Sequence, residues 1–240
     1  MPDGKLLFAK YAFRPNQLGY CGGPDSETLL DYVIEGESDP GMDALIRKFE
    51  AAYPYLRFIA DSNGIEDATD PRVVQAYWLG NELLGEVDMR AYHDFIRERF
   101  VPRIPERLQK YVLGKAPEGA RPHHSFHVLD VSMRTGALGE QIEALDRCRI
   151  SWGRIVGLDM DLAEIEYMPL VMREGRLTLG EPARRMASVS ANGRGYHNGL
   201  KVGDLVTVHW DWVCEAVQPS QVRRLEALTR FHIELANRTL

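Results

Sequence analysis

The sequence predicts an α+β fold, in which a mainly helical domain (residues 1–146) precedes a small β-barrel with a C-terminal helix (residues 147–240). Three observations predict this fold. Before Cys148, apolar residues recur at the spacing of amphipathic helices. After Cys148 the apolar residues alternate instead, in short runs separated by turn signals. Pro219 then opens another amphipathic helix. Its apolar positions are Val222, Leu225, Leu228, Phe231 and Leu235.

The composition is that of an ordinary globular protein. The chain has 240 residues, of which 45% are hydrophobic and 27% charged, and its net charge is −6. It can therefore bury one large core or two modest ones. The negative charge and the lack of Lys/Arg runs argue against a general nucleic-acid binder. No apolar run is long enough to cross a bilayer, and we see no secretory signal. Three widely spaced cysteines fit a reducing compartment, so we expect a cytoplasmic protein.

The first part of the chain contains a series of helix signals. Leu6–Phe13 is apolar and predicts a short first helix. Later start signals are Asp25-Ser26, Pro40-Gly41, Pro54, Asp70-Pro71 and Asp88. Asp70-Pro71 is the clearest, because a capping acid precedes proline at the first helical position. We therefore expect residues 5–115 to form a helical bundle.

The segment Arg14–Pro24 breaks every regular pattern. It has three glycines and two prolines in eleven residues, which indicates an ordered loop or a backbone that approaches something closely. Cys21 lies inside this segment. One interpretation makes Cys21 a small buried hydrophobe in a tight turn. The other makes it a metal ligand together with the histidines that follow.

Three histidines lie within five residues, at His123, His124 and His127. In a strand, His123 and His127 would share one face and His124 would lie on the other. In a helix, His123 and His127 are four residues apart and both could bind one metal ion. Histidines are also common as buried hydrogen-bonding residues. The sequence leaves the strand, the helix and the purely structural interpretation open.

The candidate strands of the second part are short. They are Ile150–Gly157, Ala163–Met172, Arg176–Leu179, Met186–Ser190 and Leu205–Val213. Such short strands predict a small closed or half-closed barrel. If the last strand is regular, His209 and Asp211 share one face, so Asp211 can orient the imidazole. Trp210 and Cys214 then lie on the opposite, core-facing side.

Three stretches carry a resemblance to a known family. Cys148 is followed by Gly153-Arg154-Ile155, Val202–His209 contains Gly-Asp before an aliphatic run and a histidine, and Pro219–Leu225 opens a polar helix. Residues 147–230 thereby resemble the HypC/HupF family of hydrogenase assembly chaperones.

The resemblance implies an OB-like barrel. It also implies that Cys148 holds an iron–cyanide–carbonyl unit destined for a [NiFe]-hydrogenase large subunit, with His209 as a neighbour. A thiolate suits this cargo, because low-spin iron with such ligands is soft and one sulfur ligand can be exchanged for another. Arg149 and Arg154 would favour the thiolate if their side chains reach Cys148.

The whole chain is also similar to an uncharacterised bacterial domain family that is associated with hydrogenase gene neighbourhoods. The matching phrases are Tyr11–Phe13, Pro15-Asn16, Gly19–Gly22, Tyr77–Leu84, His123–His127 and His209–Cys214. This likeness implies no activity and supports the hydrogenase interpretation by association alone.

We therefore expect an accessory protein of [NiFe]-hydrogenase maturation, which holds iron at Cys148 and His209 or docks maturation proteins or the large subunit. His123, His124, His127 and Cys21 form a second candidate metal site. One alternative is a metal-dependent enzyme that uses the three histidines for binding or acid–base work. Another is a pure protein-interaction module, whose partner binding would survive loss of both Cys148 and His209.

Overall fold

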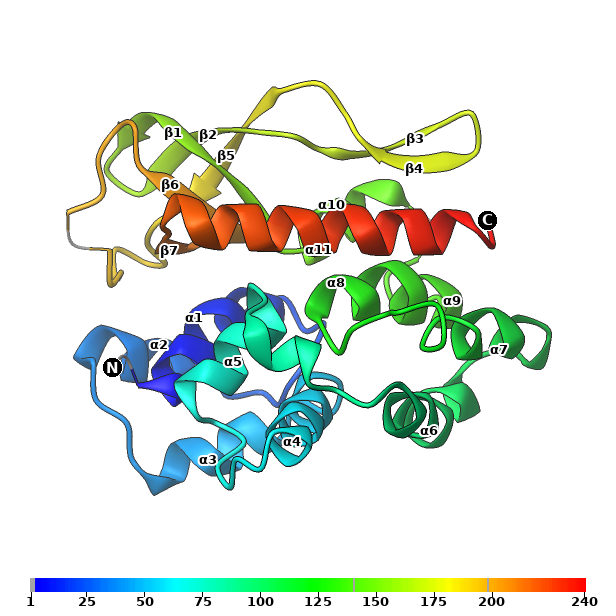
Figure 1. Ribbon diagram of the computed structural model, residues 1–240. Helices are drawn as coiled ribbons and strands as arrows, with labels where there is room; N and C mark the ends of the chain where they lie inside the picture. The colour runs from blue at the N-terminus through cyan, green and yellow to red at the C-terminus, as the bar shows by residue number, and fades with distance from the viewer. Residues whose placement is uncertain (1–2, 140, 198) are drawn as a thin grey trace.

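The computed structural model describes residues 3–139, 141–197 and 199–240 (Figure 1). The α+β class is confirmed, with helices in the N-terminal part, a five-stranded sheet and a C-terminal helix. Helix α11 (Pro219–Asn237) runs between the strands and the N-terminal helices. It packs against the strand β4 (Arg176–Leu179) on one side and against the helix that begins at His124 on the other.

The N-terminal helices begin largely where the sequence predicts. They are α1 (Gly4–Gln17), α2 (Ser26–Glu35), α3 (Pro40–Arg47), α4 (Ala52–Ser62), α5 (Pro71–Trp78), η1 (Glu82–Gly85), α6 (Met89–Arg99), η2 (Val101–Arg103) and α7 (Glu106–Leu113). Aspartate side chains accept backbone N–H bonds at the starts of α3, α5 and α6, through Asp39, Asp70 and Asp88. These caps satisfy N–H groups that have no partner inside the helix.

Helix α1 is longer than predicted. It continues through Pro15 and ends at Gln17, so the start of the expected loop is helical. Proline has no N–H to donate to the carbonyl four residues earlier, which in α1 belongs to Tyr11. That carbonyl accepts a hydrogen bond from another part of the chain instead, and this partner bears on the candidate site described below.

The histidine-rich stretch is helical, which removes the strand alternative. One continuous helix runs through α8 (His124–Phe126), η3 (His127–Ser132) and α9 (Met133–Thr135), and η3 is a π-helix. Single π-helical turns are rare in proteins, and many of those that do occur lie at functional sites. After a break, α10 (Ile142–Cys148) leads directly into the strands.

The five strands of the main sheet close on themselves in the order β1 (Ser151–Asp159), β2 (Leu162–Tyr167), β5 (Ala183–Ser188), β7 (Trp212–Ala216) and β6 (Leu205–His209). Strand β6 pairs back to β1, with Ser151 opposite Val208. Small and β-branched side chains fill the interior, among them Ile155, Ala163 and Val206. Strands β3 (Leu170–Arg173) and β4 form a separate hairpin, so the predicted strand Ala163–Met172 is in fact two strands.

The prediction of one strand over Leu205–Val213 is wrong. Trp210 and Asp211 have φ of 53° and 56°, and together they make a two-residue turn between β6 and β7. His209 and Asp211 therefore do not share a strand face, and Trp210 does not lie on the core side of a strand. Tertiary contacts hold the turn. The backbone N–H of Trp210 donates to the Arg147 carbonyl at 2.8 Å. The Nε of Arg147 lies 3.4 Å from the Asp211 carboxylate.

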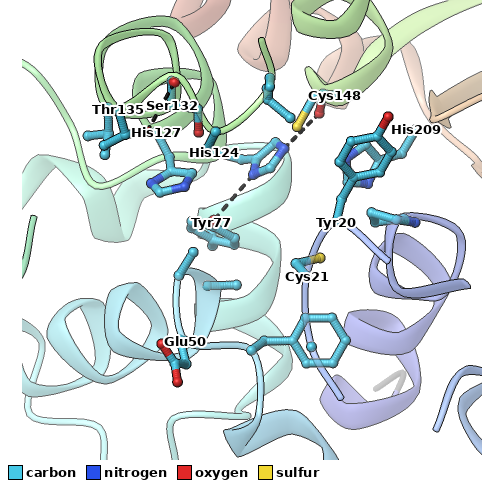
Figure 2. A pocket seen from close by; sticks show the side chains of 18 of the residues that line it. Tyr20, Cys21, Glu50, Tyr77, His124, His127, Ser132, Thr135, Cys148 and His209 are labelled. Atoms are coloured by element: carbon cyan, nitrogen blue, oxygen red, sulfur yellow. Dashed lines mark hydrogen bonds between the residues drawn. The ribbon is translucent and has the colours of Figure 1, made fainter. Parts of the chain in front are cut away.

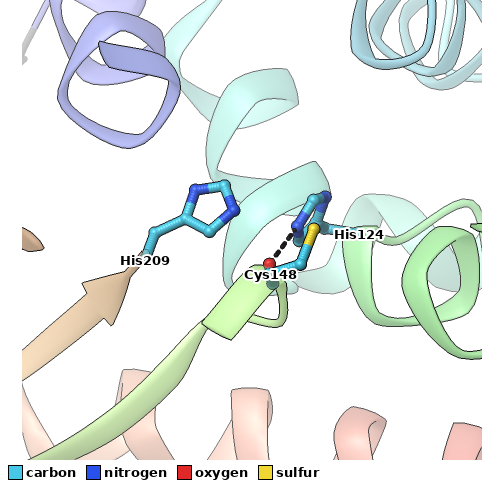
Figure 3. A group of neighbouring side chains, drawn as sticks. All are labelled: His124, Cys148 and His209. Carbon is cyan, nitrogen blue, oxygen red and sulfur yellow. Dashed lines mark hydrogen bonds between the residues drawn. The ribbon is translucent and has the colours of Figure 1, made fainter. Parts of the chain in front are cut away.

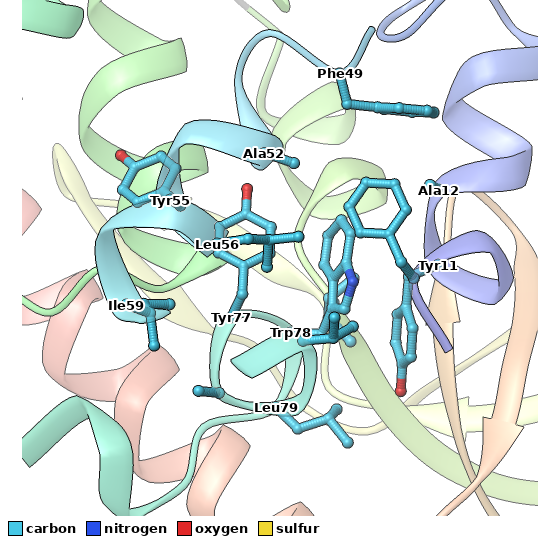
Figure 4. Close-up of a cluster of buried hydrophobic side chains, with 14 of the residues drawn as sticks. Tyr11, Ala12, Phe49, Ala52, Tyr55, Leu56, Ile59, Tyr77, Trp78 and Leu79 are labelled. Carbon is cyan, nitrogen blue, oxygen red and sulfur yellow. The ribbon is translucent and has the colours of Figure 1, made fainter. Parts of the chain in front are cut away.

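The main hydrophobic core draws on both predicted domains. It includes Phe8 and Tyr55 from the N-terminal helices together with Trp212, Cys214 and Leu235. Figure 4 shows its aromatic centre, where Trp78 stacks on Tyr11 with 5.4 Å between ring centroids. Cys214 is fully buried, which confirms its predicted place in the core. Among the described residues, no helix has both the length and the apolar character needed to cross a membrane.

Candidate metal centre

Three predicted site residues meet at one point, where both halves of the chain contribute. His124 stands at the start of α8, Cys148 at the end of α10 and His209 at the end of β6 (Figure 3). One ligand atom from each lies within 4.8 Å of the others. Two ligands of a tetrahedral metal ion are about 3.3–3.8 Å apart, so a small contraction would bring all three onto one ion. One thiol with two imidazoles suits zinc, iron, copper or nickel better than magnesium or calcium.

His209 is oriented by helix α1. Its Nδ1 lies 2.7 Å from the Tyr11 carbonyl, and because a carbonyl only accepts, Nδ1 carries the proton. This is the carbonyl that Pro15 leaves without a helical partner. The other nitrogen, Nε2, therefore presents a lone pair, and it has no hydrogen-bond partner among the described residues although the side chain is 2% exposed. A backbone carbonyl on one imidazole nitrogen is the usual support for metal binding by the other.

His124 has a partner on each nitrogen. Its Nε2 lies 2.8 Å from the Cys148 carbonyl and must donate, so Nδ1 accepts from the Tyr77 hydroxyl at 3.2 Å. To bind a metal through Nε2, His124 has to release that carbonyl and move its proton to Nδ1. Tyr77 can support both forms, because its hydroxyl is able either to donate or to accept. Burial lowers the pKa of His124 to about 4, so the imidazole is neutral, as metal binding requires.

Cys148 is partly buried and protonated in the metal-free protein. Burial raises the pKa of its thiol, and the Trp210 indole N–H opposes that rise by favouring the thiolate. The two arginines expected to help are engaged elsewhere. Arg149 pairs with Asp146 at 2.8 Å, and Arg154 donates to the Gly203 carbonyl. A metal ion would itself supply the missing positive charge and displace the thiol proton.

A cavity of about 450 Å³ adjoins the three ligands (Figure 2). Part of its wall is aromatic, from Tyr20, Phe49, Tyr77, Trp78, Phe100 and Trp210. The indole N–H of Trp78 on this wall has no hydrogen-bond partner among the described residues. The site therefore offers both a metal position and enclosed space beside it, with a donor for a small hydrogen-bond acceptor.

His127 and Cys21 line the same cavity but lie outside the group of three. His127 packs edge-on against Tyr55 at 5.6 Å. Burial lowers its pKa to about 3, and its Nδ1 has no hydrogen-bond partner in the described part of the chain. Cys21 follows α1, and burial raises its pKa to about 12.

His123 does not line the cavity. It is the N-cap of α8, with φ −127° and ψ 150°, so it lies outside the helix and the four-residue spacing to His127 does not apply. Its Nδ1 accepts from the Ser125 backbone N–H at 3.1 Å and lies 2.8 Å from the Ser125 hydroxyl. That hydroxyl also contacts His232 Nδ1 at 2.7 Å. His123 thus belongs to a buried hydrogen-bond network, and the structure does not bring it together with Cys148.

Sequence reasoning missed the residues that support the ligands. Tyr77 and Trp78 lie in the helix predicted to start at Asp70-Pro71, with no sign of a role at a site, and alternation assigned Trp210 to a strand. Pro15 was the available signal that a backbone carbonyl could orient His209. A proline inside a helix leaves the carbonyl four residues earlier without its usual donor, and here that is the Tyr11 carbonyl.

Comparison with known proteins gives a family and no activity. No curated protein and no solved structure matches the chain. The model of the "Family of unknown function (DUF6390)" matches residues 1–240, and the chain therefore belongs to this family.

Proposed function

We propose that this protein is an accessory protein of [NiFe]-hydrogenase maturation, which holds an iron–cyanide–carbonyl unit between His124, Cys148 and His209. The observation that carries the proposal is the approach of these three ligand atoms to within 4.8 Å of one another. Three protein ligands and three diatomic ligands complete six positions around iron. The thiolate is the ligand through which such a soft ion can pass to another thiolate.

Two further features support this cargo. Cyanide and carbonyl ligands project from the iron and need space, which the adjoining cavity of about 450 Å³ provides. A bound cyanide accepts hydrogen bonds at nitrogen, and the buried Trp78 indole N–H lies in the cavity wall without a partner among the described residues. The resemblance of residues 147–230 to HypC/HupF chaperones agrees with Cys148 as the iron ligand. We propose on the same basis that the closed sheet is OB-like.

Partners and compartment follow from the same proposal. The cargo would pass to hydrogenase maturation proteins or the large subunit. Cys21, Cys148 and Cys214 are all free thiols, which fits work in the reducing cytoplasm.

The test is to produce the protein together with hydrogenase maturation proteins, purify it without oxygen and record its infrared spectrum. We expect bands of iron-bound cyanide and carbon monoxide and about one iron per chain. Cys148→Ser should abolish the bands, whereas Cys214→Ser should keep them, because Cys214 is not among the residues that line the cavity. A wild-type protein without the bands, or a Cys148→Ser protein with them, would refute the iron-carrier function.

A metal-dependent enzyme is the second candidate, and the position of His127 on the cavity wall favours it. Three protein ligands leave a metal position open for substrate or water, which is typical of catalytic sites. His127 would then serve as acid or base beside the metal, while His123 would take no part. A protein that binds stoichiometric metal but never acquires the infrared bands, in wild type and in His127→Ala alike, would favour this candidate over the carrier.

A further inference from the structure

We propose that Cys21 is a second thiolate ligand of this centre, so that a bare metal ion is held by Cys21, Cys148, His124 and His209. The proposal rests on metal binding at the site proposed above, but not on the hydrogenase role. It assigns a task to the loop between α1 and α2: the loop closes on a bare ion and withdraws when exogenous ligands fill the coordination sphere.

Two independent observations point to a metal ion within reach of Cys21. Cys21 and Cys148 both line the cavity, and Figure 2 shows their side chains at the same central space, one from each side. His209 Nε2 faces this cavity, 2% exposed and without a partner among the described residues, so a ligand-binding atom is already present there. Three ligands leave one corner of a tetrahedron open, and closed four-ligand sites are the rule for structural metal ions.

The loop holds Cys21 between two anchors. Before it, Tyr20 stacks on Trp210, with ring centroids 3.9 Å apart and planes at 18°. After it, a Cβ on Gly22 would lie 2.6 Å from the Phe49 ring, so the backbone here packs directly on that ring. Asn16 Nδ2 donates to the Cys21 carbonyl at 2.7 Å. These contacts keep Cys21 at the edge of the cavity and out of bulk solvent.

Cys21 is outside the group whose ligand atoms lie within 4.8 Å of one another, so it has to move inward to bind. Gly19 allows such a shift, because it has φ +77° and a Cβ added there would meet no atom within 4 Å. Tyr20 is half exposed and can slide on Trp210 without opening the core. The hinge and the sliding contact both lie immediately before Cys21.

Two thiols that line one cavity suit a bound cation. Without a cation, two thiolates in that cavity would repel each other. A divalent cation between them removes that repulsion and displaces both protons. Two thiolates with two imidazoles select zinc, cobalt or ferrous iron.

The count of ligands explains why the loop would move. Four protein ligands satisfy a bare tetrahedral ion. An iron that carries three diatomic ligands needs three protein ligands, and the space that these diatomic ligands occupy is the cavity that Cys21 lines. Cys21 would then bind a bare ion and would leave an iron that carries three diatomic ligands.

The experiment is a Co²⁺ titration of the metal-free protein, without hydrogenase components. Thiolate-to-cobalt charge-transfer absorption grows with the number of bound thiolates, and the ligand-field bands report tetrahedral geometry. We expect tetrahedral bands with two thiolates for the wild type. Cys21→Ser and Cys148→Ser should each lose about half the charge-transfer intensity and bind Co²⁺ at least about tenfold more weakly. Cys214→Ser is the matched control and should be unchanged.

Alkylation provides a second measurement that does not depend on the variants. In the wild type, one equivalent of Zn²⁺ should protect both Cys21 and Cys148, as peptide mass spectrometry can show. Cys21→Ala is a second variant, in case Cys21→Ser disturbs the loop. Circular dichroism checks that both variants are folded. No Co²⁺ uptake by the wild type would refute the proposed metal function itself. A one-thiolate spectrum that both Cys21 variants leave unchanged, with Cys21 still alkylated, would refute only the present inference.

Discussion

At the scale of single residues, the centre depends on side chains that prepare its ligands. Pro15 is the clearest case. Because it cannot donate to the Tyr11 carbonyl, that carbonyl is free for His209 Nδ1–H at 2.7 Å. The bond fixes which nitrogen of His209 carries the proton and which presents a lone pair. A residue in the first helix thus determines the chemistry of a residue at the end of a strand nearly two hundred positions later.

We predict that Pro15→Ala lowers metal affinity about three- to tenfold, because the new N–H competes for the Tyr11 carbonyl and loosens the His209 imidazole. The free energy of unfolding should stay the same or rise, since proline is costly inside a helix. Isothermal titration with Zn²⁺ and urea unfolding measure the two quantities. Unchanged affinity together with higher stability would mean that the carbonyl accepts both donors without loss.

Two adjacent histidines show how far position within an element matters. His124 lies inside α8 and points to Cys148, whereas His123 is the N-cap and accepts a backbone N–H. Both residues are histidines, but α8 begins between them, so only the His124 side chain is directed by the helix. Sequence alone predicted a histidine site here and left open which of the three would take part, because a helix boundary of one residue is beyond what spacing can specify.

At the scale of elements, strand β1 shows why a glycine occurs near its start. Gly153 pairs with Tyr167 on β2 and with Val206 on β6. A Cβ there would lie 2.4 Å from the Glu166 carbonyl oxygen and 2.5 Å from Ile165 Cγ2. The glycine of the Gly153-Arg154-Ile155 phrase therefore has a packing reason of its own, because it lets β1 and β2 approach closely.

Gly153→Ala is predicted to lower the free energy of unfolding by about 1–3 kcal/mol, because the backbone neighbour cannot move aside as a flexible side chain could. Gly85→Ala is the control, since its Cβ would meet nothing within 4 Å. We expect that control to change stability by less than about 1 kcal/mol. Urea unfolding followed by circular dichroism compares the two. Equal stability of both variants would show that the sheet relaxes around the added methyl.

The turn between β6 and β7 is another element-scale result. Non-glycine residues in a two-residue turn with positive φ are uncommon, and Trp210-Asp211 gives no local signal such as Asn-Gly. The turn instead depends on partners distant in the sequence, including the stack with Tyr20. This is why alternation of apolar residues predicted an uninterrupted strand.

At the scale of the whole molecule, buried neutral histidines make stability depend on pH. Burial lowers the pKa of His127 and of His232 to about 3 in the folded protein. Both therefore stay neutral when folded but take up protons near pH 6.5 when unfolded. Stability that is present above that pH is lost as the pH falls towards 3. Asp130 acts in the opposite sense, because burial raises its pKa to about 6.

We predict that the free energy of unfolding drops between pH 7.5 and pH 5.5. Each buried histidine with a pKa lowered to about 4 or about 3 contributes a loss of about 1.4 kcal/mol at the lower pH, and these are His124, His127, His197 and His232. Protonation of Asp130 offsets less than about 1 kcal/mol. His232→Gln should reduce the drop by one histidine's share, whatever it does to stability at pH 7.5. Urea unfolding of variant and wild type at the two pH values measures these changes in the free energy of unfolding. The same drop in variant and wild type would place the acid sensitivity elsewhere.

The sequence by itself determined the α+β class, the change of apolar spacing at Cys148, the C-terminal helix and the soft ligand types, because these depend on local periodicity and on the chemistry of each side chain. Tertiary structure alone decided that His124 meets Cys148 and His209, that His123 does not, and that the chain turns at Trp210. The physical reason is that these outcomes depend on contacts between α1, α5, α8 and β6, which are far apart in the chain. No local spacing encodes that Tyr77 and Trp210 line one cavity, or that the Tyr11 carbonyl meets His209.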